Sequence, residues 1–471
     1  MLDLEKIKSD YPEIDFNEER IKILEEIESG HRCFLNIIGK AGCGKSVTLN
    51  FLKRYLDDKG KNIIVCATTG VASALLNTEN PDCKSTTLHS TFLIRPQNIQ
   101  GNFDPSNIRT SVERREQLEK VIENADFIFI DESSMLTSDI FNYLIEELLY
   151  FRHGTLPSII LFGDIFQLPP VVKMNDKDIK DYYKNYLDSK IFFYNAPRFK
   201  DLKFKTIELS KVYRQKDDME FTEILNRIRV GKQTQSDIDK INTRCVSENK
   251  QIDWDLDNED SVRLCPTNNE CNTYNQIFLD AVDSPLVSIP SDIKGNFLYT
   301  DEFKSGLYPE ELKLKVGAKV MITRNAPSDE ESGYRAYVNG DVGIVTSIND
   351  EFVGVQLKDK EVCVKAEKVS HEEYCVEKND DRISVDTHET GSWTNFPLKI
   401  SYAITIHKSQ GTTLDKGVID LGHWVAESGV YVARSRFRHL NDFILTRPIK
   451  MSDIKVCKES KEFLDTLDKV N

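Results

Sequence analysis

The first half of the chain alternates short apolar runs with amphipathic stretches. Runs of strand length fall at residues 33–38, 63–66, 127–130 and 159–162. Helices are predicted at 46–56, where apolar residues recur on one face, and at 71–76. Strands that alternate with helices predict an α/β fold with a parallel sheet, whose ligand sites lie at the carboxyl ends of the strands.

Two segments interrupt this alternation. Residues 93–124 carry Pro96, Gly101 and Pro105 before a charged helix, and they predict a small insertion. A second α/β block is expected to begin near Thr206 and to resume at about 396, with a strand-rich, charged β insertion between its two parts. The predicted boundaries are 1–92 with 125–195 for the first block, 93–124 for its insertion, 196–299 with 396–471 for the second block, and 300–395 for the β insertion.

Composition narrows the class of protein. The 62 Lys and Arg against 77 Asp and Glu give a net charge of −15, which disfavours a diffuse electrostatic binder of nucleic acid but allows a narrow positive channel. No apolar run is long enough for a transmembrane helix, and the acidic start MLDLEKIKSDYPEIDF resembles neither a signal nor a transit peptide. We therefore expect a cytoplasmic protein without a membrane partner. Ten scattered cysteines without a C-x-x-C pair favour reduced thiols over zinc ligands or a disulfide scaffold.

A phosphate-binding loop follows the first predicted strand. Residues 39–46 read GKAGCGKS and fit G-x-x-x-x-G-K-[ST] between a strand and a helix, the context that this motif requires. Its backbone N–H groups are expected to surround phosphates at the positive end of the helix, while Lys45 reaches the β- and γ-phosphates and the Ser46 hydroxyl binds Mg²⁺. The predicted nucleotide contacts here are Gly39, Ala41, Gly42, Cys43, Gly44, Lys45 and Ser46.

An acidic pair ends the strand at 127–130. Asp131 is positioned to hold Mg²⁺, directly or through water, and Glu132 to orient and deprotonate an attacking water. Beside a phosphate-binding loop, such a pair indicates hydrolysis of a nucleoside triphosphate rather than its storage.

Several further motifs occur in a fixed order along the chain. They include a long TIHKSQGTTLD run and a GDIFQLPP run, and with them the chain resembles superfamily 1 helicases of the Pif (petite integration frequency) and RecD-related branch over residues 30–447. The motifs that carry the resemblance are TGVA at 69–72, TLHSTF at 87–92, IDESSM at 130–135, GDIFQLPP at 163–170, VYRQ at 212–215, TIHKSQGTTLD at 405–415 and YVARSR at 431–436.

The resemblance implies two RecA-like P-loop NTPase domains, with an SH3-like β-barrel inserted in the second. It implies ATP and Mg²⁺ as cofactors, Gln167 as a γ-phosphate sensor, Arg214 and Arg436 as arginine fingers from the second domain, and Gly411 as a nucleotide contact. Catalytic roles thus fall on Lys45, Asp131, Glu132, Gln167, Arg214 and Arg436. The implied DNA contacts are Thr69, Gly70, His89, Ser90, Phe92, Asn339, Gly340, His407, Lys408 and Ser409.

Some of these residues have simpler interpretations. Phe92 fits either a platform on which a base stacks or a core side chain, and Asn339–Gly340 fits a plain hairpin turn as well as a DNA contact. The chain also departs from the family pattern at Arg20, where a Gln usually hydrogen-bonds adenine. Smaller departures occur at Thr68, Gly429 and Arg434.

The function that the resemblance implies is an ATP-dependent DNA helicase. It would move 5′-to-3′ on single-stranded DNA and open 5′-tailed or forked duplexes, as a monomer without an obligate protein partner. The direction of movement comes from the resemblance alone. The alternatives are a single-strand translocase that remodels complexes without separating strands, and a P-loop NTPase switch that binds no nucleic acid, which the charge of −15 would suit.

Overall fold

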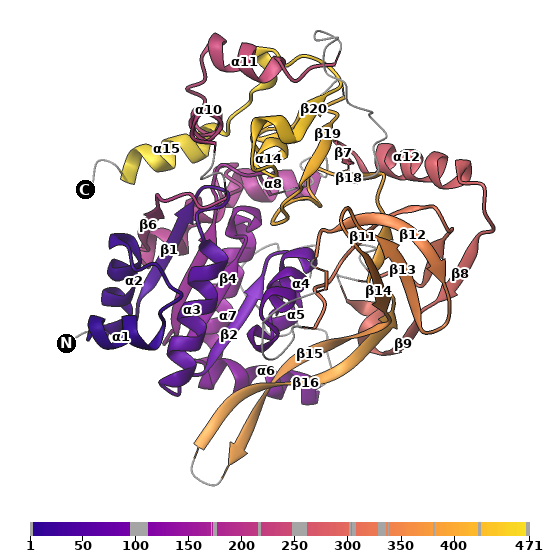
Figure 1. Cartoon of the computed structure of the whole chain (residues 1–471). Helices are drawn as coiled ribbons and strands as arrows, with labels where there is room; N and C mark the ends of the chain where they lie inside the picture. The colour runs from indigo at the N-terminus through magenta and orange to yellow at the C-terminus, as the bar shows by residue number, and fades with distance from the viewer. Residues whose placement is uncertain are drawn as a thin grey trace.

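The computed structural model contains two α/β blocks, an antiparallel β region and a long hairpin (Figure 1). The structure describes residues 3–94, 112–170, 172, 177–214, 218–246, 261–300, 303, 308–327, 336, 337, 339–379, 382–422 and 425–467. Residues 95–111, most of the predicted insertion at 93–124, lie outside the described residues. Within the described ranges, no helix has both the length and the hydropathy needed to cross a membrane.

The first block is built on a six-stranded parallel sheet. Its strand order is β3-β2-β4-β5-β1-β6, and all four apolar runs predicted as strands lie in it. The strands are β1 (Phe34–Gly39), β2 (Ile63–Ala67), β3 (Thr86–Thr87), β4 (Phe127–Asp131), β5 (Ser158–Gly163) and β6 (Lys205–Leu209). Predominantly apolar runs form β1, β2, β4 and β5 because both faces of the sheet are covered there.

The helices of the first block cover the two sheet faces separately. One face packs against α1 (Leu4–Asp10), α2 (Glu18–Glu28) and α3 (Lys45–Asp58). The other packs against α5 (Leu88–Thr91), α6 (Val112–Asn124) and α7 (Ser138–Phe151). Consecutive residues of one strand, such as Ile128 and Phe129, enter opposite cores. The remaining helices here are α4 (Gly70–Glu79), α8 (Lys177–Tyr186) and α9 (Pro197–Asp201).

The second block has a smaller parallel sheet in the order β18-β7-β19-β20. Its strands are β7 (Ser261–Cys265), β18 (Ala403–Thr405), β19 (Lys416–Ile419) and β20 (Phe443–Leu445). The helices around it are α10 (Met219–Arg229), α11 (Gln235–Asn242), α12 (Asn268–Ala281) and α14 (Gly429–Arg434). The prediction of two α/β blocks with parallel sheets is therefore confirmed.

The β insertion contains a five-stranded antiparallel sheet with its own apolar core, in the order β14-β13-β12-β11-β17. Its strands are β11 (Lys319–Ile322), β12 (Val342–Ile348), β13 (Phe352–Gln356), β14 (Glu361–Lys365) and β17 (Leu398–Ile400). Two smaller sheets accompany it and contain β8 (Val287–Pro290) with β10 (Glu311–Leu314), and β9 (Asp292–Gly295) with the hairpin β15 (Glu367–Asn379) and β16 (Arg382–Asn395).

The β15–β16 hairpin leaves the β insertion and lies along the first block (Figure 1). The Val65 N–H of β2 donates to the Tyr374 hydroxyl at 2.8 Å, and this hydroxyl donates in turn to the Val65 carbonyl oxygen at 3.1 Å. Ion pairs join Lys84 to Asp386 at 2.6 Å and Arg114 to Glu373 at 2.7 Å. Tyr374 thus supplies the hydrogen bonds that a neighbouring strand would otherwise give to β2.

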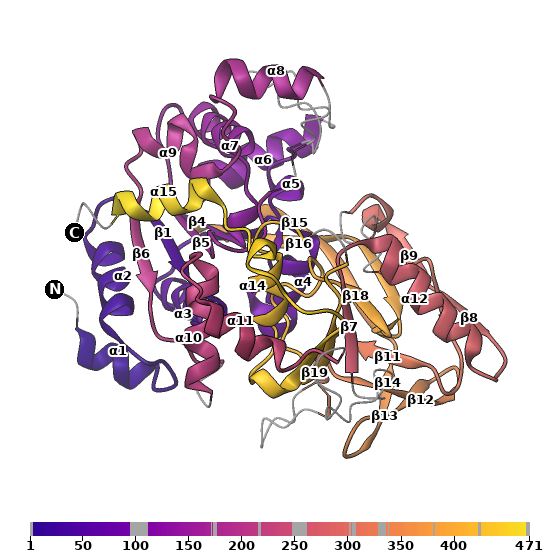
Figure 2. The same cartoon turned by 90° about the horizontal axis from the view of Figure 1, so that it is seen from above.

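The predicted domain boundaries need three corrections. First, β6 pairs with β1, so the first block continues past residue 195. Second, β8, β9 and β17 pair within the β region, which therefore extends beyond 300–395 at both ends. Third, α15 (Lys458–Leu467) packs on the first block, where Phe463 stacks on Tyr194 with ring centroids 4.4 Å apart (Figure 2). Pairing between segments distant in the chain causes all three differences.

Candidate nucleotide and nucleic-acid sites

A cavity of about 750 Å³ lies between the two α/β blocks, and we call it the central cavity. The first block contributes the phosphate-binding loop and the ends of β4 and β5, and the second contributes the segments around 411 and 436. The predicted residues that line it are Ala41, Gly42, Gly44, Lys45, Ser46, Asp131, Glu132, Gln167, Arg214, Gly411 and Arg436. The fold therefore brings together residues that are 395 positions apart in the sequence, from 41 to 436.

The loop between β1 and α3 has the backbone geometry that its glycines permit. Gly42 and Gly44 have φ of +76° and +83°, which strain any residue with a side chain. A Cβ on Gly42 would also lie 2.4 Å from the Arg214 Cβ. The Lys45 ammonium donates to the carbonyl oxygens of Gly39 and Lys40, at 3.0 and 3.1 Å. Backbone groups of the loop thus surround the N-terminus of α3.

Two predicted loop residues do not line the central cavity. The Cys43 side chain is buried in the core between the sheet and α3, and a Cβ on Gly39 would lie 2.4 Å from its sulfur. The prediction that Cys43 contacts nucleotide is therefore corrected for its side chain, because the thiol faces inward and only backbone atoms remain for a ligand. Gly39 instead allows the close packing of Cys43.

The acidic pair lies at the end of β4. Burial, together with the charge of Glu132, raises the pKa of Asp131 to about 7. Burial also raises the pKa of Glu132, against the opposing charges of Lys45 and Arg436. Glu132 has φ of +51°, and its Oε2 has no hydrogen-bond partner among the described residues. An unpartnered oxygen on a strained residue suits a general base that receives a proton from water.

The donor set beside the loop suits Mg²⁺. The Ser46 hydroxyl and the Asp131 carboxylate both line the central cavity, and hard oxygen ligands are those that Mg²⁺ prefers. Few protein ligands are needed, because Mg²⁺ in nucleotide sites also takes phosphate oxygens and water.

The two predicted arginine fingers differ in origin. Arg436 follows α14 of the second block, is fully buried, and donates to the carbonyl oxygens of Val432 and Ser409. Arg214 instead follows β6 of the first sheet, which corrects its assignment to the second domain. Its Nη1 donates to the Ser435 carbonyl oxygen at 3.1 Å. Burial, with the nearby charge of Arg436, lowers the pKa of Arg214 to about 9, so both cations lie where a negative charge would stabilise them.

Buried hydrogen bonds connect the two blocks behind the central cavity. The Ala41 N–H of the phosphate-binding loop donates to the Tyr431 hydroxyl at 3.0 Å, and this hydroxyl donates to Asp164 Oδ2 at 2.8 Å. Arg229 donates to the other Asp164 oxygen at 3.0 Å. We call these four residues the Tyr431 network. The sequence analysis predicted a nucleotide contact for Ala41 but assigned no role to Asp164, Arg229 or Tyr431, although Asp164 and Tyr431 lie in two of the recognised motifs.

A second direct link involves the predicted sensor. The Gln410 amide nitrogen donates to the Gln167 side-chain oxygen at 3.2 Å, and both side chains are buried. Gln410 comes from the TIHKSQGTTLD motif, two residues after Lys408. A change at Gln167 can therefore reach the segment that was predicted to contact DNA.

The predicted DNA contacts on the two blocks meet at a smaller cavity of about 200 Å³ beside the central cavity. Thr69, His407 and Lys408 line it, together with Asp131 and Glu132. Thr69 caps α4 by accepting from the Ala72 N–H at 3.2 Å, and Gly70 forms the buried first turn. His407 and Lys408 are exposed on the loop after β18.

Two predicted DNA contacts are wrong for their side chains. Phe92 is fully buried in the core of the first block, so its ring cannot stack on a base. Ser409 is also fully buried, and its hydroxyl donates to the Ile406 carbonyl oxygen at 2.8 Å. Apolar burial and a local hydrogen bond explain why these residues occur in their motifs.

The remaining predicted contacts are at least partly accessible. His89 and Ser90 lie on α5, and a small cavity places Ser90 beside Tyr374 of the hairpin. Asn339 and Gly340 form a turn that leads into β12, with φ of +98° at Gly340. The preceding strand of the chain, β11, ends at Ile322, so this turn is not a two-residue hairpin between described strands. A Cβ on Gly340 would lie 3.6 Å from the Thr413 carbonyl oxygen, so this turn touches the second block at the TIHKSQGTTLD motif.

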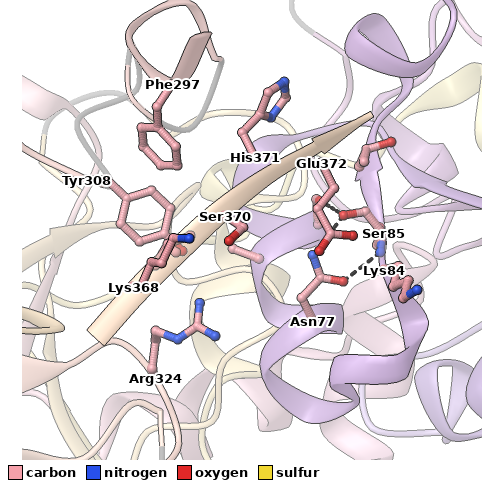
Figure 3. A pocket seen from close by; sticks show the side chains of 14 residues that line it. Asn77, Lys84, Ser85, Phe297, Tyr308, Arg324, Lys368, Ser370, His371 and Glu372 are labelled. Carbon is pink, nitrogen blue, oxygen red and sulfur yellow. Dashed lines mark hydrogen bonds between the residues drawn. The ribbon is translucent and has the colours of Figure 1, made fainter. Parts of the chain in front are cut away.

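A further cavity of about 230 Å³ lies beneath the hairpin (Figure 3). Strand β15 crosses this cavity and contributes Lys368 to it, with Tyr308 and Phe297 on one side of the strand and Asn77 and Ser85 on the other (Figure 3). Its cations already pair with carboxylates, as Lys84 with Asp386 at 2.6 Å, Arg324 with Glu367 at 2.9 Å and Lys368 with Glu389 at 2.7 Å. The sequence analysis did not predict this cavity, because the hairpin forms one of its walls.

Comparison with known proteins places the chain. The model of the PIF1-like helicase family matches residues 15–239. The Pif1 ATP-dependent DNA helicase of Bdellovibrio bacteriovorus is 30% identical over 434 residues, which cover 90% of this chain and 86% of that protein. The chain belongs to the PIF1-like helicase family. The resemblance inferred from the motifs is thereby confirmed.

Solved structures of PIF1-like helicases extend the match to the whole fold. The structure of Bacteroides sp. Pif1 in complex with ADP-AlF4 is similar at a TM-score of 0.79, with 29% identity over 97% of this chain and 98% of that one. The structure of Bacteroides Pif1 bound to ssDNA is similar at a TM-score of 0.63, with the same identity and coverage. These matches, together with the two parallel sheets, establish two RecA-like domains in the PIF1-like chain.

Proposed function

We propose that this chain is an ATP-dependent DNA helicase that moves 5′-to-3′ on single-stranded DNA and opens 5′-tailed or forked duplexes. The observation that carries the proposal is the central cavity, where a phosphate-binding loop and two carboxylates of one RecA-like domain face Arg436 and Gly411 of the other. The named activity of the Bdellovibrio relative and the DNA-bound Bacteroides structure support DNA as the second ligand.

The chemistry follows from the residues of the central cavity. Lys45 and the loop N–H groups bind the phosphates, and Ser46 with Asp131 would hold Mg²⁺. Mg²⁺ held by these residues would supply positive charge beside the phosphates. Glu132 orients a water and takes its proton. Arg214 and Arg436 stabilise the charge that develops on the transferred phosphoryl group.

Movement along DNA requires that hydrolysis change the contact between the domains. The Tyr431 network joins the phosphate-binding loop of the first domain to α14 of the second. The Gln167–Gln410 bond joins the first domain to the segment of the second that carries His407 and Lys408. Thr69 and His89 on the first domain, with His407 and Lys408 on the second, would each grip the strand through phosphates and bases without reading sequence. The 5′-to-3′ direction rests on the family resemblance.

The antiparallel sheet completes the proposed assembly. We assign its five strands to an SH3-like insertion, because these short antiparallel strands enclose their own apolar core. Its Asn339–Gly340 turn lies beside the Thr413 segment, which supports a role near DNA. One chain supplies both sides of the central cavity, so the proposal requires only a monomer.

Two matched partial duplexes test the proposal, one with a 5′ single-stranded tail and one with a 3′ tail. With ATP and Mg²⁺ we expect separation of the 5′-tailed substrate only, and ATP hydrolysis that single-stranded DNA stimulates. Lys45→Ala should abolish strand separation and ATP hydrolysis while DNA binding persists. The substitution removes a phosphate contact, and Lys45 does not line the smaller cavity where Thr69, His407 and Lys408 meet.

Each other outcome has a definite meaning. Separation of the 3′-tailed substrate alone would overturn the direction, and DNA-stimulated hydrolysis without separation would favour the translocase. Hydrolysis that single-stranded DNA neither stimulates nor alters, in a protein that does not retain DNA, would refute a nucleic-acid motor and favour the NTPase switch.

A further inference from the structure

Gln167, the predicted γ-phosphate sensor, lies on a buried turn at the end of β5, and we call residues 163–167 the sensor loop. Within it, the Phe166 N–H donates to Asp164 Oδ1 at 3.1 Å, and the Gln167 N–H donates to the Asp164 carbonyl oxygen at 2.9 Å. The side chains from Asp164 to Gln167 are all buried. The backbone of this turn therefore determines where the Gln167 amide lies in the central cavity.

Two helices of the second block hold the sensor loop by the Asp164 carboxylate, through Tyr431 and Arg229. The Arg229 guanidinium also lies 4.7 Å from the centroid of the Phe166 ring, a distance at which a cation and an aromatic ring attract each other. These contacts act on side chains of the loop. A separate contact acts on its backbone, and it comes from near the end of the chain.

The backbone contact is made by Ser460 in α15. This residue is fully buried, and its hydroxyl donates to the Ile165 carbonyl oxygen at 2.7 Å. The Tyr194 hydroxyl lies 2.9 Å from the Ser460 Oγ. Because Ser460 gives its single proton to Ile165, the Tyr194 hydroxyl is the donor in this second bond. A chain of two hydroxyl donors therefore ends on the Ile165 carbonyl, two residues before Gln167.

The segment that leads into α15 is tied to the second block. The Ser428 N–H, at the start of α14, donates to the Lys455 carbonyl oxygen at 2.8 Å, and the Lys455 ammonium donates to the Val425 carbonyl oxygen at 2.9 Å. Five residues after Lys455, Ser460 contacts the sensor loop of the first block. Since α14 leads directly to Arg436, a short stretch of chain connects the helix before this arginine to the loop that carries Gln167.

We infer that Ser460 is a positioning residue for Gln167, and that α15 transmits the position of the second block to the sensor loop. The inference rests on the proposed function, because Gln167 acts on the γ-phosphate in that function. No other described residue donates a hydrogen bond to the Ile165 carbonyl. Without the Ser460 hydroxyl, this buried carbonyl loses its donor, and the peptide group that fixes the turn is free to rotate.

Binding of the nucleotide itself should not depend on Ser460. Neither Ser460 nor Tyr194 lines the central cavity, and the phosphate-binding loop makes its contacts through Lys45 and backbone groups. A displaced Gln167 should therefore lower kcat and leave KM for ATP almost unchanged, since its interaction is made with the phosphoryl group that is transferred.

The test compares Ser460→Ala with Tyr194→Phe in ATP hydrolysis, with and without saturating single-stranded DNA. Ser460→Ala should lower kcat by about 3- to 30-fold in both conditions and change KM by less than about threefold, because the Ile165 carbonyl loses its donor. Tyr194→Phe is the matched control, since it removes the other hydroxyl of the same buried chain but keeps the bond from Ser460 to Ile165. Both variants should lose thermal stability, whereas Tyr194→Phe should keep the wild-type kcat.

A binding measurement separates this inference from the proposed function. Equilibrium binding of a fluorescent ADP analogue, with and without aluminium fluoride, reports recognition at the γ-phosphate position without turnover or DNA. Ser460→Ala should weaken the aluminium fluoride complex by about 3- to 30-fold and leave ADP binding unchanged.

Three results would overturn the inference. They are a wild-type kcat in Ser460→Ala, an equal loss of kcat in Tyr194→Phe, and equal weakening of ADP with and without aluminium fluoride. The second of these would assign Ser460 to the stability of the core alone. A wild type whose hydrolysis DNA does not stimulate would refute the proposed function, and the comparison of the two variants without DNA would still decide the role of Ser460.

Discussion

Replacing Tyr431 by Phe removes one hydroxyl from the contact between the two RecA-like domains. Its ring is 4% exposed, and its hydroxyl is the only part that the substitution deletes. That hydroxyl accepts from the Ala41 N–H and donates to Asp164, so both neighbours lose a bond. Phe keeps the packing of the ring, and the substitution therefore tests the bonds themselves.

The size of the effect follows from what remains buried. Without the hydroxyl, the Ala41 N–H faces no acceptor, and one Asp164 oxygen loses its donor while the other keeps Arg229. A buried polar group without a partner costs about 1–3 kcal/mol. Since Ala41 belongs to the phosphate-binding loop, this cost destabilises the state in which the two domains are in contact. A free-energy cost of about 1.4 kcal/mol corresponds to a tenfold change, so kcat/KM for ATP should fall by about 5- to 150-fold.

Steady-state hydrolysis with saturating single-stranded DNA measures this loss. Tyr402→Phe is the control, because the Tyr402 hydroxyl accepts from the Lys319 N–H at 3.1 Å in the β insertion, outside the residues that line the central cavity. It should lower thermal stability without lowering kcat/KM. The reasoning is refuted if Tyr431→Phe keeps kcat/KM within about threefold of the wild type, or if Tyr402→Phe loses as much.

Two further predictions concern buried carboxylates. The pKa of Asp131 is raised to about 7, so its proton competes with Mg²⁺ below that pH, and the Mg²⁺ concentration for half-maximal hydrolysis should rise by about fivefold from pH 7 to pH 6; half-saturation that is constant from pH 6 to 8 would contradict this role. Glu147 in α7 is fully buried, neither of its carboxylate oxygens has a hydrogen-bond partner among the described residues, and burial raises its pKa well above 4.5. As the pH rises, the unfolded chain loses this proton before the folded protein does. The free energy of unfolding therefore falls by about 1.4 kcal/mol per pH unit above pH 4.5, until the pH reaches the pKa of Glu147 in the folded protein. Glu147→Gln should remove this slope in urea unfolding, whereas Glu146→Gln, which loses a partly exposed pair with Arg198, should keep it.

The phosphate-binding loop and the acidic pair could be predicted from sequence because each is a local pattern. A strand, a glycine turn and a helix follow one another within residues 33–56, and this order alone fixes which end of the sheet they occupy. The structure accordingly places Lys45 and Asp131 in one cavity. The long motifs also indicated the second α/β block. The hydrogen bond between Ala41 and Tyr431 could not be predicted, because the two residues belong to different blocks.

What could not be predicted depends on pairing across long distances and on which side of a loop faces inward. β6 extends the first sheet because it pairs with β1, 170 residues earlier at the Asn36–Thr206 register. Phe92 and Ser409 belong to motifs in which neighbouring residues are partly or fully exposed, and only the packed structure reveals that these two side chains are buried. Arg20 was identified as a departure from the family, but its orientation over Gly44 is set by Asp15 and Thr48.

Two late segments complete the first RecA-like domain, and this has a consequence for synthesis on the ribosome. Residues up to Leu209 contain all six strands of its sheet, but the part of β2 that the short β3 leaves unpaired is closed by Tyr374, and the core around Tyr194 by Phe463. A nascent chain that has reached β6 therefore exposes an unpaired strand edge and an uncovered aromatic patch, which are surfaces that promote aggregation. These surfaces stay exposed while more than 150 further residues are translated, up to Tyr374, and the patch for longer still. The domain made first is thus among the last parts of the molecule to finish folding.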